Sequence, residues 1–132
     1  MAYTYKFVNK YNETIYIGYT GQTMAQRINQ HFTKGHLPKS VYEEVAKIEY
    51  IKHKTKSDAQ VWEVYLINKY KPRYNTLNKK NDMLTIDLGE ENWKVYQVLK
   101  QQAIKQKTHW GCLIWITILA LFYAIYELIA MM

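Results

Sequence analysis

Two short stretches near the N-terminus constrain the fold most strongly, because their residues alternate in character over strand-length segments. Residues 3–8 and 14–19 are rich in aromatic and β-branched side chains, and the polar residues 9–13 separate them. Alternation with a period of two on both sides of a short polar connection is typical of a β-hairpin. We therefore expect two antiparallel strands at the start of the chain.

Helix and strand signals after the hairpin complete one small domain. Thr23 is expected to cap a helix with an apolar stripe of Met24, Ile28 and Phe32. A third strand is expected over residues 45–53, which are again aliphatic and aromatic in alternation.

A second, longer helix is expected after Asp58, and Pro72 ends it because proline cannot continue a helix. The sequence thus predicts an α+β fold over residues 1–80, with helices flanking a small three-stranded antiparallel sheet. The next segment, 81–109, is expected to hold a linker and then an amphipathic helix over residues 92–107. A short strand over residues 83–88 is an alternative that moves the domain boundary.

The last part of the chain, residues 110–132, is almost purely apolar. As a helix, the 22 residues from Gly111 to Met132 rise about 33 Å, which matches a hydrocarbon core of about 30 Å. Ten of them are Leu, Ile or Phe and favour insertion by about 5 kcal/mol, more than the cost of about 3 kcal/mol for Glu127. We expect a transmembrane helix here; a buried or oligomerising helix is the alternative.

Charge and cysteine content limit the classes of binding partner and the cellular compartment that we expect for the chain. The net charge is +7, and the apolar tail contributes almost none of it, so the positive charge lies on the rest of the chain. Such an excess favours polyanions or an anionic membrane surface. Basic residues precede the apolar tail and none follows it, which predicts a single-pass membrane protein with a cytoplasmic N-terminal domain. The single cysteine, Cys112, excludes an intrachain disulfide.

The first 75 residues also contain a spaced set of polar side chains suited to phosphate ester chemistry. They are Tyr5, Tyr16, Arg27, His31, Glu63 and Asn75. A phenol or imidazole can activate water, a guanidinium matches phosphate oxygens, and a carboxylate can hold Mg²⁺. Each residue alone has an ordinary structural explanation. The interpretation as a site for phosphate ester chemistry therefore depends on the order and spacing of the whole set.

This order resembles the GIY-YIG nuclease superfamily over residues 1–80. The second motif is complete as Tyr16-Ile17-Gly18, whereas the first is degenerate, since Tyr3-Thr4-Tyr5 matches Gly-Ile-Tyr only in its last tyrosine. The segments 26–31 and 63–75 are similar to the arginine helix and to the glutamate helix with its closing Lys-Pro-x-Tyr-Asn.

The resemblance implies a role for each polar residue. Glu63 would hold a catalytic Mg²⁺ or Mn²⁺, and Arg27 would stabilise the charged phosphate. Tyr16, ranked above Tyr5, would help to activate the attacking water, with His31 as the candidate proton acceptor. The amide of Asn75 would orient the phosphate or brace a neighbouring loop. The surface residues expected to contact a nucleic-acid backbone are Lys6, Lys10, Lys34, Lys39, Lys69, Lys71 and Arg73.

Two functions follow as alternatives. The first is a metal-dependent DNA endonuclease tethered to a membrane by residues 110–132. The second is a membrane-tethered nucleic-acid-binding or assembly protein that keeps the fold without turnover. The completeness of Tyr16, Arg27 and Glu63 favours the first, and the degenerate first motif favours the second.

Overall fold

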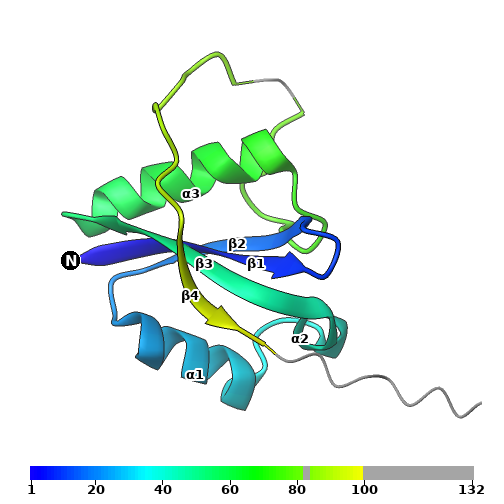
Figure 1. The fold of residues 1–132 in the computed structure, drawn as a ribbon. Coiled ribbons are helices and arrows are strands. Elements are labelled where there is room, and N and C mark those ends of the chain that lie inside the picture. Colours follow the sequence, from blue (N-terminus) through cyan, green and yellow to red (C-terminus); the bar gives the residue numbers. More distant parts are fainter. Residues whose placement is uncertain (82–83, 100–132) are drawn as a thin grey trace, which may run out of the picture. The chain divides into compact units, whose positions relative to one another are not determined.

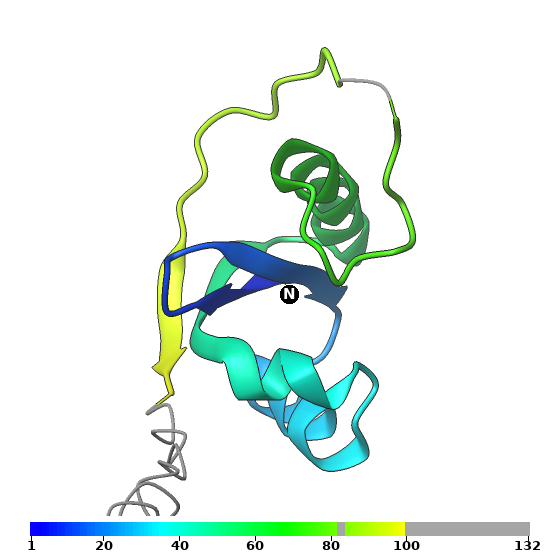
Figure 2. The same cartoon turned by 90° about the vertical axis from the view of Figure 1, so that its right-hand side faces the viewer.

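The computed structural model describes residues 1–81 and 84–99, which form an antiparallel sheet covered by helices on both faces. In chain order the elements are β1 (Ala2–Asn9), β2 (Thr14–Thr20), α1 (Met24–Lys34), α2 (Lys39–Glu44), β3 (Val45–His53), α3 (Lys56–Tyr70) and β4 (Lys94–Val98). The sheet has four strands in the order β2-β1-β3-β4. Helix α3 lies on one face, and α1 and α2 lie on the other (Figures 1 and 2).

The expected hairpin is confirmed. Strands β1 and β2 pair antiparallel from Tyr3↔Thr20 to Val8↔Thr14. The side chain of Asn9 holds the turn, since its Oδ1 accepts hydrogen bonds from the backbone N–H groups of Tyr11 and Glu13. Contacts within the hairpin therefore fix its turn.

Helix α1 begins at the expected cap but buries a different stripe. Thr23 and Gln26 form a capping box, which satisfies backbone donors at the helix start. His31 is 0% exposed, whereas Phe32 is 43% exposed, so the expected position of Phe32 in the stripe is wrong. At 3.6 residues per turn, the seventh residue after Met24 returns almost to the same direction and the eighth overshoots it. The geometry of the helix thus turns His31, and not Phe32, toward the sheet.

Helix α3 is confirmed, with Thr55 as its N-cap in a second capping box with Asp58. It ends at Tyr70, where Lys71 adopts a left-handed conformation with φ 49°, and Pro72 follows. The chain then turns back along the outer edge of β2. The Tyr74 N–H donates to the Ile15 carbonyl over 3.2 Å.

Asn75 completes this cover of the β2 edge. Its Oδ1 accepts from the Ile17 N–H at 2.9 Å, and its Nδ2 donates to the Ile17 carbonyl at 2.8 Å. One side-chain amide therefore takes the place of a neighbouring strand and satisfies both backbone groups of Ile17.

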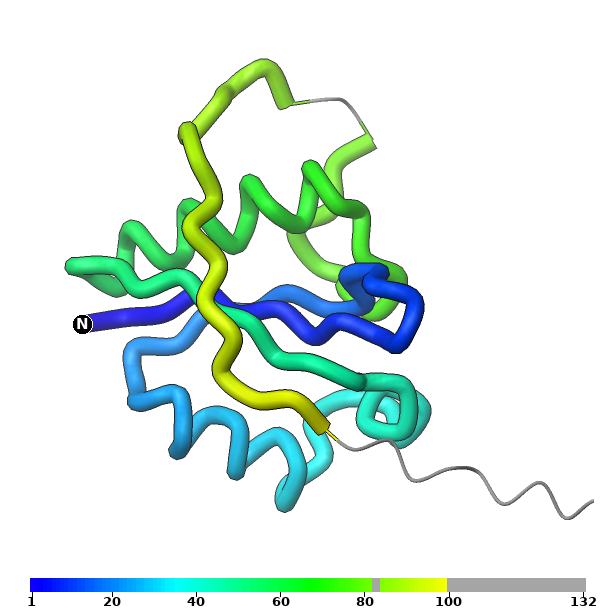
Figure 3. Tube along the Cα trace, in the orientation of Figure 1, coloured from blue at the N-terminus to red at the C-terminus, as the bar shows by residue number. Residues whose placement is uncertain are grey.

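A fourth strand corrects the expectation for the segment after residue 80. The helix expected over residues 92–107 is wrong at its start, because β4 pairs with β3 from Tyr50↔Lys94 to Lys47↔Val98. No strand forms over residues 84–88. The physical reason is the free edge of β3, whose backbone groups gain partners from the alternating residues 94–98. The domain thus extends past the boundary expected near residue 80 (Figure 3).

One carboxylate holds the segment that leads into β4 against α3. We call this segment, residues 84–93, the crossing segment. Glu91 accepts hydrogen bonds from Lys69, from the Tyr70 hydroxyl and from the Trp93 indole N–H. Lys6 lies 4.1 Å from the centroid of the Trp93 ring and forms an ion pair with Glu49. Lys6 is therefore a buried structural cation, contrary to its expected place on a nucleic-acid surface.

The remaining expectations for the tail, including the transmembrane helix over 110–132, lie outside the described residues. Among residues 1–81 and 84–99, no helix has both the length and the apolar character needed to cross a bilayer.

The double hydrogen bond of Asn75 predicts a loss of stability in Asn75→Ala. The substitution leaves the Ile17 N–H and carbonyl without partners in a buried position, so the free energy of unfolding should fall by about 2 to 4 kcal/mol. Urea denaturation followed by circular dichroism measures it. Asn29→Ala on the exposed face of α1 is the matched control and should change stability by less than about 0.5 kcal/mol. Equal effects of the two substitutions would show that the Asn75 bonds contribute nothing.

Candidate active site

The site forms where β1, β2 and α1 bring three polar side chains around one buried hydroxyl. Tyr5 Oη lies 2.7 Å from His31 Nε2. It also accepts a hydrogen bond from Arg27 Nε at 2.9 Å. Strand β1 supplies the hydroxyl, and α1 supplies both partners one turn apart, as expected for residues four apart on a helix.

Tyr16 joins this group from β2. Its ring centroid lies 6.3 Å from that of Tyr5 and 5.7 Å from that of His31. Its hydroxyl lies close to the Tyr5 hydroxyl and to the Arg27 guanidinium, and both affect its pKa. We call Tyr5, Tyr16, Arg27 and His31 the hydroxyl cluster.

Gly18 makes room for the hydroxyl cluster. A Cβ atom at Gly18 would lie 2.6 Å from Tyr5 Oη and 3.1 Å from Tyr16 Oη. The first distance is shorter than any real contact of a Cβ, so a side chain here would displace the hydroxyl of Tyr5. The glycine of the Tyr-Ile-Gly motif is thus required by close approach.

The two tyrosines of the hydroxyl cluster differ in burial. Tyr5 is 0% exposed, and burial raises the pKa of its hydroxyl far above the ordinary value of a phenol. Tyr16 is half-buried; burial also raises the pKa of its hydroxyl, while the charge of Arg27 lowers it. Tyr16 is therefore the more exposed of the two tyrosines, and Tyr5 holds the cluster together from inside.

His31 is neutral at physiological pH. Burial, followed by the positive charge of Arg27, lowers the pKa of His31 to about 4. Its Nδ1 lies 3.5 Å from the hydroxyl of Tyr42, which accepts the Leu37 N–H. An uncharged imidazole with both nitrogens near hydroxyls orients Tyr5 and adds no charge to the site.

Glu63 approaches the same place from α3, on the other face of the sheet. Burial raises the pKa of its carboxyl group to about 7, although the backbone N–H of Tyr19 and the charge of Arg27 both lower it. The carboxylate also acts electrostatically on Tyr16. The structure therefore gathers Tyr5, Tyr16, Arg27, His31 and Glu63 around the β2 edge. Asn75 binds the backbone of Ile17 between Tyr16 and Gly18, as a positioning residue.

The residues present fit a divalent cation that prefers oxygen and water. Within the part of the chain that the structure describes, no three His, Cys, Asp or Glu residues gather as a metal cage. Mg²⁺ does not need one, because it keeps several waters and takes one or two carboxylates together with substrate phosphate. Glu63 is a half-buried carboxyl group whose charge burial disfavours, so a cation beside it would stabilise the charged form.

A basic groove leads away from Arg27. Its volume is about 540 Å³, and Gly21, Gln22, Gln30 and Lys56 are among its lining residues. Lys56, the first residue of α3, was not among the expected DNA contacts because its sequence context carries no signal. Its stem passes 3.4 Å from the place of a Cβ on Gly21. Lys56 and Arg27 thus present two cations along one groove.

Most of the basic residues expected on a nucleic-acid surface are instead used in local contacts. Lys39 pairs with Glu43, Lys69 with Glu91, and Arg73 with Glu44. Lys71 donates to Asn68. Because these cations already have partners, the groove beside Arg27 is the better candidate for phosphate contacts.

Comparisons with known proteins agree with this geometry. A family model described as the GIY-YIG catalytic domain matches residues 1–81. The UvrABC system protein C of Bacteroides thetaiotaomicron is 37% identical over 78 residues, which are 57% of this chain and 13% of that protein. The protein of the same name from Clostridium kluyveri is 33% identical over 94 residues, 66% of this chain and 15% of the relative. The chain thus spans a small part of the curated relatives it matches.

Solved structures show the same domain. Two crystal structures of point mutants of the GIY-YIG N-terminal endonuclease domain of UvrC from Thermotoga maritima are 28% and 30% identical, each with a TM-score of 0.51. The likeness covers 57% of this chain and 82% of those chains, and both of those domains are bound to their catalytic divalent cation. The family model matches more than half of the sequence, so this chain belongs to the GIY-YIG family and its first 81 residues form a GIY-YIG catalytic domain.

Proposed function

We propose that the protein is a DNA endonuclease that hydrolyses phosphodiester bonds with Mg²⁺ or Mn²⁺. The observation that carries the proposal is the convergence of Tyr16, Arg27 and Glu63 at the β2 edge, beside a basic groove. The similar domain of UvrC from Thermotoga maritima supports it, because that domain is an endonuclease bound to its catalytic divalent cation. Hydrolysis of a phosphodiester needs several cooperating groups, because the barrier to be removed is well over ~10 kcal/mol.

Glu63 is the residue that would hold the cation. When bound, the cation polarises the phosphate, lowers the pKa of a bound water and stabilises the departing oxygen. Glu63 is placed for this by α3, whose capping box fixes the start of the helix two turns earlier. The Tyr19 N–H bond orients the carboxyl group toward β2.

Arg27 would bind the scissile phosphate. Its Nε is engaged by Tyr5, so the position of the planar guanidinium is fixed before the substrate arrives. Its charge persists at any physiological pH, and a pre-positioned donor stabilises charge that develops in the transition state. Lys56 lies along the same groove and suits a neighbouring phosphate.

Tyr16 would orient the attacking water through its hydroxyl. Its raised pKa keeps the phenol protonated at neutral pH, so it acts as a hydrogen-bonding partner of the water and not as a free phenolate. Tyr5 and His31 hold Tyr16 and Arg27 in place from the core. In the hydrolysis, the water oxygen bonds to phosphorus and loses a proton to solvent. The bond from phosphorus to the leaving oxygen breaks, and that oxygen takes up a proton from solvent.

The degenerate first motif does not disturb this arrangement, which favours the enzyme over the binding-only alternative. Tyr3 pairs in regular register with Thr20 on β2 and Lys52 on β3. Its ring packs edge-on against Tyr50, with the centroids 5.7 Å apart. Tyr3 is therefore accommodated against Tyr50 on β3, within regular strand pairing.

Replacement of Glu63 and Arg27 tests catalysis. In Glu63→Gln and Arg27→Ala, nicking of supercoiled plasmid with Mg²⁺ should fall by at least about 100-fold, because each removes one charge from the transition state. Glu43→Gln, on the exposed face of α2, should nick as the unaltered protein does. Circular dichroism verifies the fold of each variant. Folded variants that cleave normally would reject catalysis at this site, and an unaltered protein that binds DNA without cutting it would support the binding-only alternative.

The raised pKa of Glu63 predicts pH-dependent cation binding. An acid with a pKa of about 7 is mostly protonated at lower pH, so Mn²⁺ affinity should fall by about tenfold per pH unit below pH 7 and level off above it. His31, with its pKa of about 4, adds no dependence above pH 5. Calorimetric Mn²⁺ titrations between pH 5.5 and 8.5 measure the effect. Glu63→Gln should bind Mn²⁺ only weakly at every pH. An affinity of the unaltered protein that stays constant down to pH 5.5 would contradict the role of Glu63.

We further propose that residues 110–132 anchor the domain to the cytoplasmic side of a membrane. The support is the sequence: an apolar stretch of bilayer length, preceded by basic residues. Vesicle sedimentation of the full chain and of a chain ending at residue 109 tests it. The full chain should stay with vesicles in 1 M salt, and the shorter chain should not. Release of the full chain by salt would mean that the basic domain only adheres to the surface.

A further inference from the structure

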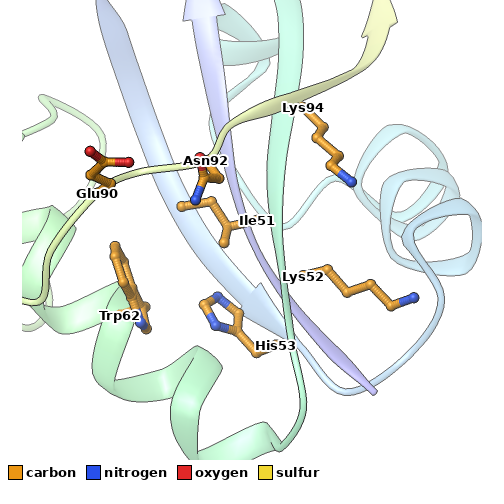
Figure 4. A pocket seen from close by; sticks show the side chains of 7 residues that line it. All are labelled: Ile51, Lys52, His53, Trp62, Glu90, Asn92 and Lys94. Carbon is orange, nitrogen blue, oxygen red and sulfur yellow. The ribbon is translucent and has the colours of Figure 1, made fainter.

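A second cleft lies beside α3, away from Glu63. Its volume is about 330 Å³, and Ile51, His53, Trp62, Glu90 and Asn92 line it (Figure 4). Successive residues of a helix point about 100° apart, so Trp62 projects from a different flank of α3 than Glu63, which follows it. We call this hollow the Trp62 cleft.

The aromatic walls of the Trp62 cleft are held in place. The rings of Trp62 and His53 lie 5.8 Å apart between centroids at an angle of 38°. Thr4 Oγ1 donates to the Ala59 carbonyl, so it accepts from His53 Nε2 at 2.9 Å, which leaves Nδ1 of His53 as an acceptor. Trp62 also packs edge-on against Tyr65. A fixed, half-exposed indole is a ready stacking surface.

The floor of the cleft is an unpaired part of the sheet. The pairing of β3 with β1 continues to Ala2↔His53, but the described pairing with β4 stops at Tyr50↔Lys94. Beyond Tyr50, the outer edge of β3 therefore has no strand partner among the described residues. The amide of Asn92 and the carboxylate of Glu90 lie above this edge, on the crossing segment (Figure 4).

Charges of opposite sign lie on opposite sides of the cleft. Lys52 and Lys94 direct their ammonium groups to the side of β3 away from Trp62 (Figure 4). Neither forms an ion pair with a described residue. Glu90 stands near Trp62 and would repel a phosphate there. The surroundings of Trp62, Asn92 and Glu90 thus suit an aromatic base, and the two lysines suit a phosphate.

We propose that the Trp62 cleft binds one unpaired nucleotide of a DNA strand, with its base stacked on Trp62 and its phosphate at Lys52 and Lys94. The inference rests on the proposed function and specifies its substrate class: DNA with an unpaired nucleotide close to the cut, such as a flap, a gap or a single-strand junction. Stacking on a fixed aromatic ring is how proteins hold single strands without reading their sequence.

The two sites are close enough for one strand. Lys54 lines a hollow that shares Lys52, His53 and Trp62 with the cleft, and Lys56 lines the groove beside Arg27. Only Thr55 separates these lysines in the chain, at the start of α3. A strand that passes over this end of α3 crosses one helix diameter, about 10 Å.

The direct test changes the DNA and leaves the protein intact. Fluorescence anisotropy of the full chain in detergent with EDTA measures affinity for a duplex with a one-nucleotide flap and for the same duplex with an abasic flap. The intact base should strengthen binding by about 5- to 100-fold. Equal affinities would overturn the proposal, whether or not the protein cuts DNA.

Variants then locate the effect. Trp62→Ala should abolish the preference for the intact base, Trp62→Phe should keep most of it, and Tyr11→Ala, an exposed aromatic on the β1–β2 turn, should keep all of it. A folded Trp62→Ala protein with the full preference would place the base elsewhere and reject the cleft.

The outcome is separable from that of the proposed function. Binding without divalent cations does not depend on cleavage, so a base preference in a protein that never nicks plasmid supports the cleft and rejects the endonuclease. Nicking by a protein without any base preference supports the endonuclease and rejects the cleft.

Discussion

The buried hydroxyl of Tyr5 is the constraint on which the rest of the site depends. A phenol that is 0% exposed must find hydrogen-bond partners inside the protein, and its partners here are Arg27 and His31 on α1. Satisfying this one atom fixes α1 against the sheet and brings the Arg27 guanidinium to the β2 edge. Gly18 is the counterpart of the same constraint, because only a residue without a side chain leaves room for the hydroxyl. Tyr5 is thus a buried core residue that also holds the guanidinium of Arg27 in position.

Helix α3 divides the chemistry of the domain between two of its flanks. One flank carries Glu63 to the hydroxyl cluster, and Lys56, seven residues earlier, lies along the groove beside it. The neighbouring flank carries Trp62, which the crossing segment and β4 turn from a surface residue into the wall of a cleft. The carboxylate of Glu91 secures that segment through three donors, so the strand beyond the family-like core also shapes a candidate binding surface.

The sequence predicted local structure well where short-range chemistry decides it. Thr23 forms a capping box and begins α1 as expected, and the turn after Asn9 lies where the polar residues indicate it. Helix α3 begins at Lys56 with Thr55 as its cap, before the expected start after Asp58. The apolar pattern predicted Phe32 in the buried stripe of α1, whereas the turn of the helix brings His31 to that face, where Tyr5 is its hydrogen-bond partner. Strand β4 was missed because its residues satisfy helical spacing equally well, and only the free edge of β3 selects the strand. Arg27 and Glu63 were found from motif order, whereas the groove position of Lys56 depends on tertiary packing that no local pattern records.

The central claim is that Glu63, Tyr16 and Arg27 together form one cation-dependent site at the β2 edge. Anomalous scattering from a crystal soaked with Mn²⁺ tests it most directly. We expect one strong Mn²⁺ peak beside the carboxyl group of Glu63, on the side that faces Tyr16 and Arg27. A peak only at other carboxylates, such as Asp58 or Asp87, with none at Glu63, would contradict it.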